Sequence, residues 1–77
     1  MAIIRSIEQA NRNVKRHRTS VDATFQVVDD PAGRLFHLST YGSDDRLSEP
    51  KVSQTIQLDR EEAEVLVQAL RDAFPGI

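Results

Sequence analysis

The chain contains no cysteine, and it has only three glycines, three phenylalanines and one tyrosine among its 77 residues. Without cysteine it can form neither disulfides nor thiolate zinc sites. The two histidines, His17 and His37, lie in different segments without the i, i+4 spacing of a helical metal site. No metal site and no cofactor are therefore expected.

Long apolar runs are also missing. No stretch approaches the roughly 20 residues of a membrane-spanning helix, and the start, Met1 to Ile4, meets a charge at Arg5 too soon for a secretory signal. The lack of cysteine fits a reducing compartment. A cytoplasmic location without membrane contact is expected.

Catalytic motifs are absent as well. The sequence has no Gly-x-Ser-x-Gly, no phosphate-binding glycine loop, no His-Glu-x-x-His and no cysteine nucleophile. The paired acids Asp29-Asp30 and Asp44-Asp45 fall in predicted turns, where aspartate commonly hydrogen-bonds to nearby backbone. The sequence therefore predicts a protein that is not an enzyme.

The size of the chain bears on its assembly. Residues 1–77 are expected to form a single domain, and a domain of this size buries only about 60% of its unfolded surface. Small domains gain stability from disulfides, metals or oligomerisation. With the first two excluded, a homodimer is expected.

Charge is divided unevenly along the chain. Residues 1–18 hold five basic residues against one acidic residue, a net charge of +4, whereas the remaining residues sum to −6. A basic end can contact phosphates even when the whole chain is acidic. The alternative is that these charges only solvate an exposed helix end.

Periodicity predicts the elements. Apolar residues at spacings of three and four over 3–16 predict a helix, although Ile3-Ile4 could instead open a short strand. Alternating residues predict strands over 21–27, 35–41 and 52–58, separated by a turn at 29–33 and a polar loop at 42–50. Asp59 is expected to cap a C-terminal helix with an apolar stripe. That stripe is Ala63, Leu66, Val67, Leu70 and Phe74.

The predicted fold is α+β: a helix, a three-stranded antiparallel meander and a C-terminal helix, with both helices on one face of the sheet. The other face is then open and mostly polar. Its residues are Asp22, Thr24, Gln26, Leu35, His37, Ser39, Tyr41, Ser53, Thr55 and Gln57. His37 and Tyr41 could stack on bases. The candidate phosphate contacts are Arg12, Lys15, Arg16, Arg18, Arg46 and Lys51.

Three segments follow one another between Leu35 and Leu70: Leu35-Phe36-His37-Leu38-Ser39-Thr40-Tyr41 before an acidic loop, Thr55-Ile56-Gln57-Leu58-Asp59, and an amphipathic helix from Glu61-Glu62. This half of the chain resembles the C-terminal part of the transcriptional coactivator positive cofactor four and its short bacterial relatives. The resemblance implies a curved sheet followed by a helix, a dimer, and single-stranded DNA bound on the sheet. The family has a basic residue where this chain has Ser39.

Two functions remain open. In the first, a homodimer binds single-stranded DNA or RNA across its open sheets. In the second, the chain is an adaptor or accessory subunit, whose acidic C-terminal half or exposed strand edge contacts a protein partner. The basic cluster at 12–18 favours the first function, and the overall acidity favours the second.

Overall fold

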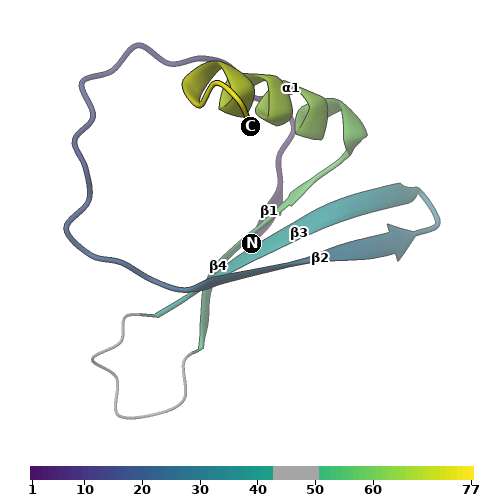
Figure 1. Ribbon diagram of the computed structural model, residues 1–77. Helices are drawn as coiled ribbons and strands as arrows, with labels where there is room; N and C mark the ends of the chain where they lie inside the picture. Colours follow the sequence, from purple (N-terminus) through teal and green to yellow (C-terminus); the bar gives the residue numbers. More distant parts are fainter. Residues whose placement is uncertain (43–50) are drawn as a thin grey trace.

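The computed structural model describes residues 1–42 and 51–77, and within that part the chain forms one sheet and one helix (Figure 1). β2 (Ala23–Asp30), β3 (Gly33–Tyr41) and β4 (Val52–Leu58) are antiparallel neighbours. β1 (Ala2–Ile3) pairs parallel with the outer side of β4. The strand order is β1-β4-β3-β2, and α1 (Arg60–Ala73) follows β4.

A tight hairpin joins β2 to β3. Asp30 pairs with Gly33, and the Asp30 carboxylate accepts a hydrogen bond from the backbone N–H of Ala32. Gly33 has a φ of +140°, a conformation that residues with a Cβ rarely adopt. Beside the turn, Arg34 donates to Asp29 at 2.8 Å, and this hydrogen bond, with the charge of Asp29, raises the pKa of Arg34.

The C-terminal helix begins where the sequence predicts. The Asp59 side chain accepts a hydrogen bond from the backbone N–H of Glu62 at 3.0 Å, so the predicted cap is confirmed. The backbone N–H of Phe74 closes the last turn on the carbonyl of Leu70. None of the helices in the described residues is long and apolar enough to cross a membrane.

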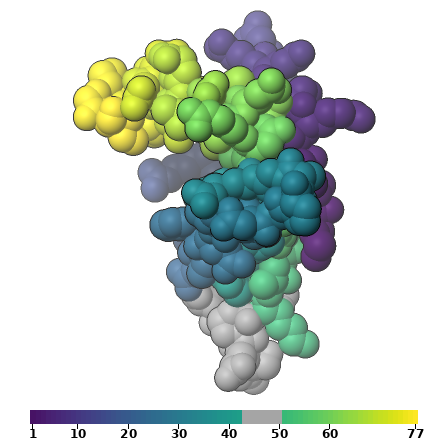
Figure 2. All heavy atoms as spheres, turned by 90° about the vertical axis from the view of Figure 1, so that its right-hand side faces the viewer, coloured from purple at the N-terminus to yellow at the C-terminus, as the bar shows by residue number. Residues whose placement is uncertain are grey.

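The helix does not lie flat on the sheet. Figure 2 shows α1 at one end of the sheet, with its yellow C-terminal half projecting past the strands. Among the described residues, one apolar side chain is buried, that of Leu58, which is 4% exposed. The hydrophobic centre of one isolated chain is therefore very small.

The predicted arrangement of helices is wrong. Residues 3–16 do not form a helix: Ala2–Ile3 is a strand, the alternative that Ile3-Ile4 left open, and residues 4–22 have no regular structure. The meander is extended by β1 into a four-stranded mixed sheet. No second helix covers the sheet in the described residues, so two helices cannot share one face.

Backbone pairing explains this outcome. The N–H of Ile4 donates to the carbonyl of Gln57 at 2.9 Å, which continues the β1–β4 pairing one residue beyond the strand. β-branched Ile3 and Ile4 suit this extended backbone. Edge pairing to residues more than fifty positions away in sequence thus overrides the local apolar spacing that predicted a helix.

Candidate functional site

Strand pairing divides the sheet into two faces. Partners across antiparallel strands point to the same side, and successive residues alternate between sides. The pairs Gln26 with His37 and His37 with Gln57 therefore define one side, here called the polar face. The opposite side, here called the apolar face, holds Phe25, Val27, Phe36, Leu38, Ile56 and Leu58. The alternation predicted from the sequence places these residues on the same faces. A register shift between Thr40 and Tyr41, which strict alternation does not predict, sets Tyr41 opposite Val52.

A chain of hydrogen bonds crosses the middle of the polar face. The imidazole of His37 contacts the Gln57 amide nitrogen through Nδ1 at 3.0 Å and the Ser39 hydroxyl through Nε2 at 3.2 Å. Ser39 in turn contacts the hydroxyl of Thr55 at 3.1 Å. Ser39 and Thr55 are buried, at 4% and 6% exposure. The network holds the His37 ring in one orientation across β3 and β4.

The donor and acceptor roles in this network follow from the tautomer of His37. With the Gln57 amide nitrogen as donor, Nδ1 accepts and Nε2 carries the proton. The imidazole then donates to Ser39, which is opposite to the arrangement in which histidine removes a proton from serine. In this tautomer the network positions a flat ring.

Tyr41 is held at one end of the same face. Its hydroxyl is 3.0 Å from the hydroxyl of Thr24, across the pair of strands β3 and β2. Its backbone N–H donates to the carbonyl of Asp22. Tyr41 is half-buried, so one side of the molecule presents a ring whose tip is tied to the neighbouring strand.

The proposed phosphate contacts are only partly brought together. The backbone N–H of Gly42 donates to the carbonyl of Lys51, which places Lys51 beside the Tyr41 end of the sheet. Arg46 lies outside the described residues, as do Asp44-Asp45 and most of the predicted loop at 42–50. His37, Tyr41 and Lys51 thus belong to one region of the sheet.

The remaining basic residues lie in residues 4–22, here called the N-terminal arm. Figure 1 shows the arm leaving β1, passing α1 and returning to β2 as a wide loop that stands away from the sheet. The structure does not bring the arm's central part onto the polar face. The arm does rejoin the sheet beside Tyr41, through Asp22. The basic residues of its second half are Arg12, Lys15, Arg16 and Arg18.

Thr24, Ser39, Thr55 and Gln57 were predicted to share a face with the two rings, but their part in fixing those rings is seen only in the structure. These four residues alternate with the apolar residues of their strands, and that alternation was the sequence signal that could have indicated hydrogen bonds to the rings. In the described residues no group of three or more histidine or carboxylate side chains could hold a metal ion.

Comparison of the chain with protein-family models, with curated proteins and with solved structures finds no match.

Proposed function

We propose that the protein is a small non-enzymatic module that binds single-stranded DNA or RNA across its polar face, as a homodimer. The observation that carries the proposal is the pair of rings, His37 and Tyr41, each held by hydrogen bonds to a neighbouring strand. An aromatic ring that stacks on a base contributes about 1–3 kcal/mol, with little dependence on which base it is. The surrounding hydroxyls and amides can hydrogen-bond to the bases and the backbone.

The spacing of the rings suits more than one nucleotide. His37 and Tyr41 are four residues apart on β3 and on the same face, so they lie about 13 Å apart along the strand. Each ring can therefore stack on a different base of one strand. Because both rings are tied in place before binding, little side-chain freedom is lost when they stack.

Charge supports contact with phosphates at the Tyr41 end. Lys51 lies there, and Arg18 precedes Asp22 by four residues, a reach of at most about 14 Å of extended chain. The acidic residues of the hairpin, Asp29 and Asp30, lie at the opposite end of β2. A strand on the polar face would thus have its phosphates nearest the basic end of the sheet.

The resemblance to positive cofactor four supports the same face. In that family the sheet binds single-stranded DNA, and a basic residue stands where this chain has Ser39. Here Ser39 is buried in the His37–Thr55 network. We expect stacking and neutral hydrogen bonds to take a larger share of the binding energy, and phosphate contacts a smaller one.

The test is fluorescence anisotropy with a labelled single-stranded oligonucleotide, titrated with the full chain over a range of salt concentrations. The two histidines give matched variants: His37→Ala should weaken binding, whereas His17→Ala, in the arm, should not. Non-specific single-strand binding has a Kd of about 100 μM or below at physiological salt. If affinity is weaker than about 100 μM at every salt concentration, the proposal is wrong.

A second candidate is an adaptor that adds a partner's strand to β2. β2 is the last strand of the sheet, and its side chains are exposed apart from half-buried Val28. An edge strand offers unpaired backbone groups to an added strand. A protein partner that protects the β2 amides from hydrogen exchange, with no affinity for single strands, would favour this function.

A further inference from the structure

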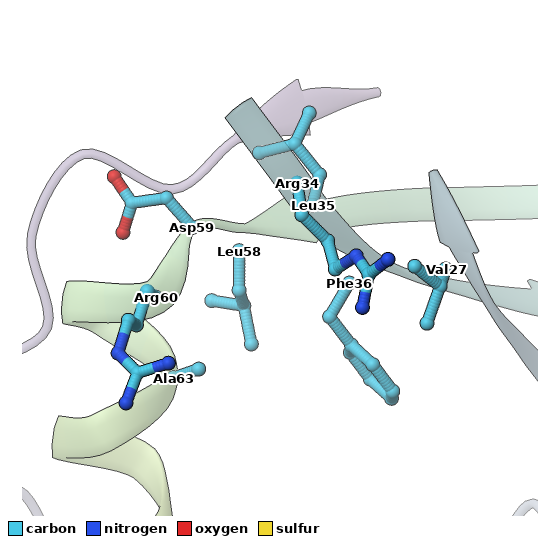
Figure 3. Close-up of a pocket in the computed structure, with 8 residues that line it drawn as sticks. All are labelled: Val27, Arg34, Leu35, Phe36, Leu58, Asp59, Arg60 and Ala63. Carbon is cyan, nitrogen blue, oxygen red and sulfur yellow. The ribbon is translucent and has the colours of Figure 1, made fainter. Parts of the chain in front are cut away.

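The apolar face and α1 together line an open cleft of about 430 Å³. Figure 3 shows Val27, Phe36 and Leu58 pointing to the side on which α1 lies, with Ala63 at the base of the helix. Leu35 points to the other side of the sheet. The cleft therefore joins the apolar face to the helix in one continuous surface.

Large apolar side chains on this surface are left uncovered. On β2, Phe25 is 71% exposed and Val27 is 55% exposed. Phe25 stacks on Phe36 with ring centroids 5.6 Å apart, so the exposed ring is held in place. On α1, Leu70 and Phe74 are also exposed. Large contiguous apolar patches, such as the one that Phe25, Val27 and Phe36 form on the sheet, are rare on monomers and mark interaction sites.

The amount of exposed surface shows how much is left to cover. One chain exposes 7386 Å², whereas a compact monomer of its mass exposes roughly 4,700 Å². Its radius of gyration is 14.8 Å, against roughly 11–12 Å for a compact chain of this length. Part of the excess of roughly 2,700 Å² belongs to the extended N-terminal arm. The whole excess is more than three times the roughly 800 Å² that each partner buries in a standard stable complex.

We infer that a second copy of this chain covers the apolar face and the exposed side of α1, in a two-fold symmetric dimer. A two-fold interface pairs the same patch on both copies, so that patch must not repel itself. Arg34 and Asp29, the charged pair at the hairpin end of this face, neutralise each other within one chain. Arg60, which also lines the cleft, pairs with Glu64 of the same helix. A largely apolar surface whose charged side chains pair within one chain fits a second identical surface.

The polar faces of the two copies then point away from each other. The dimer presents two separate binding surfaces, and neither is covered by the interface. The inference rests on the homodimer of the proposed function, but its test involves no nucleic acid, so a failure to dimerise is distinguishable from a failure to bind single strands.

Sedimentation equilibrium of the full chain at micromolar concentration tests the inference directly. The expected mass is twice the 8.7 kDa of one chain. Phe25→Glu should weaken dimerisation at least a hundredfold, because it places a charge within the interface. Gln26→Glu, the next residue on the opposite face, adds the same charge and should leave the mass unchanged. A monomer, or an assembly of more than two copies, in the unmutated protein would overturn the inference.

Because Phe25→Glu could also unfold the chain, a second measurement uses the unmutated protein. Hydroxyl-radical labelling should modify Phe25 and Phe74 at least threefold more slowly than the same residues in unstructured peptides, with fully exposed Met1 as an internal reference. Labelling at more than a third of the peptide rate would overturn the inference. A dimer without affinity for single strands would leave it intact and remove only the proposed function.

Discussion

The two faces of the sheet differ in how far one chain completes them. On the polar face, side chains of β2, β3 and β4 satisfy one another through hydrogen bonds, and no buried polar side-chain atom in the described residues lacks a partner. On the apolar face, Phe25 and Val27 remain mostly exposed. Hydrogen-bonding needs can be met pairwise within a single layer, whereas apolar burial needs a second layer.

This difference separates two roles. A face whose side chains are already ordered can bind a ligand without first rearranging, and it suits recognition. A face that leaves its apolar groups in water gains free energy when a partner covers it, and it suits assembly. Variants that change one face at a time test this separation.

The largest effect is expected at the interior of the apolar face. Leu58→Ala should lower the free energy of unfolding by about 2–5 kcal/mol, because it removes a buried side chain and leaves a cavity. Gln57→Ala, one residue away on the polar face, loses a hydrogen bond and should cost about 1 kcal/mol. Urea unfolding at one fixed chain concentration measures both. Equal losses would remove the distinction between the faces.

The next effect is on binding. Tyr41→Ala should weaken affinity for a single-stranded oligonucleotide by about 1–3 kcal/mol through lost stacking. The slope of log K against log salt should stay almost unchanged, because the side chain carries no charge. Anisotropy titrations at several salt concentrations measure both quantities. Weaker binding that comes with a lower melting temperature would indicate unfolding and not a lost contact.

The arm gives a smaller effect of another kind. Each cation that neutralises a phosphate contributes about −0.7 to the salt slope on single strands. Lys15→Ala combined with Arg16→Ala should therefore make the slope of log K against log salt shallower by roughly 1.4. Between 1 M and 0.15 M salt, the affinity of the double variant should then rise about tenfold less than that of the unmutated protein. An unchanged slope would mean that the arm, which stands away from the sheet, does not contact phosphates.

Local chemistry made much of the sheet and of α1 predictable. The alternation in β2, β3 and β4 and the Asp59 cap each depend on residues close in sequence, and each is confirmed. The turn lies where it was predicted but is shorter, because Asp29 and Asp30 belong to β2 and Gly33 begins β3. The assignment of His37 and Tyr41 to one face follows from the same alternation.

The errors concern long-range structure. The apolar spacing of Ile3, Ile7 and Val14 matches a helix, but the backbone near Ile3 pairs with β4 through contacts that no local pattern reports. The expectation that two helices cover the apolar face assumed that one chain buries its own hydrophobic surface. The exposure of Phe25 shows that this assumption fails.

The smallest effect tests whether the polar face is ordered by its own hydrogen bonds. Tyr41→Phe keeps the ring but removes the hydroxyl that lies 3.0 Å from Thr24. Thr24→Val removes the other partner with little change of shape. Each change should lower the free energy of unfolding by at most about 1.5 kcal/mol, because water can replace the lost partner of this exposed hydrogen bond. Stacking on bases should largely survive.

The two variants and their double mutant form a thermodynamic cycle. If the hydroxyls stabilise the ring through each other, the double mutant should cost less than the sum of the single changes, by about 0.5 kcal/mol or more. If the proposed function holds, urea unfolding and oligonucleotide affinity should show the same coupling, because the bond that orders Tyr41 in the free protein would also present it to a base. Coupling in stability without coupling in affinity would mean that the Thr24–Tyr41 bond supports the sheet alone. In that outcome the ring of Tyr41 is not held in advance for stacking.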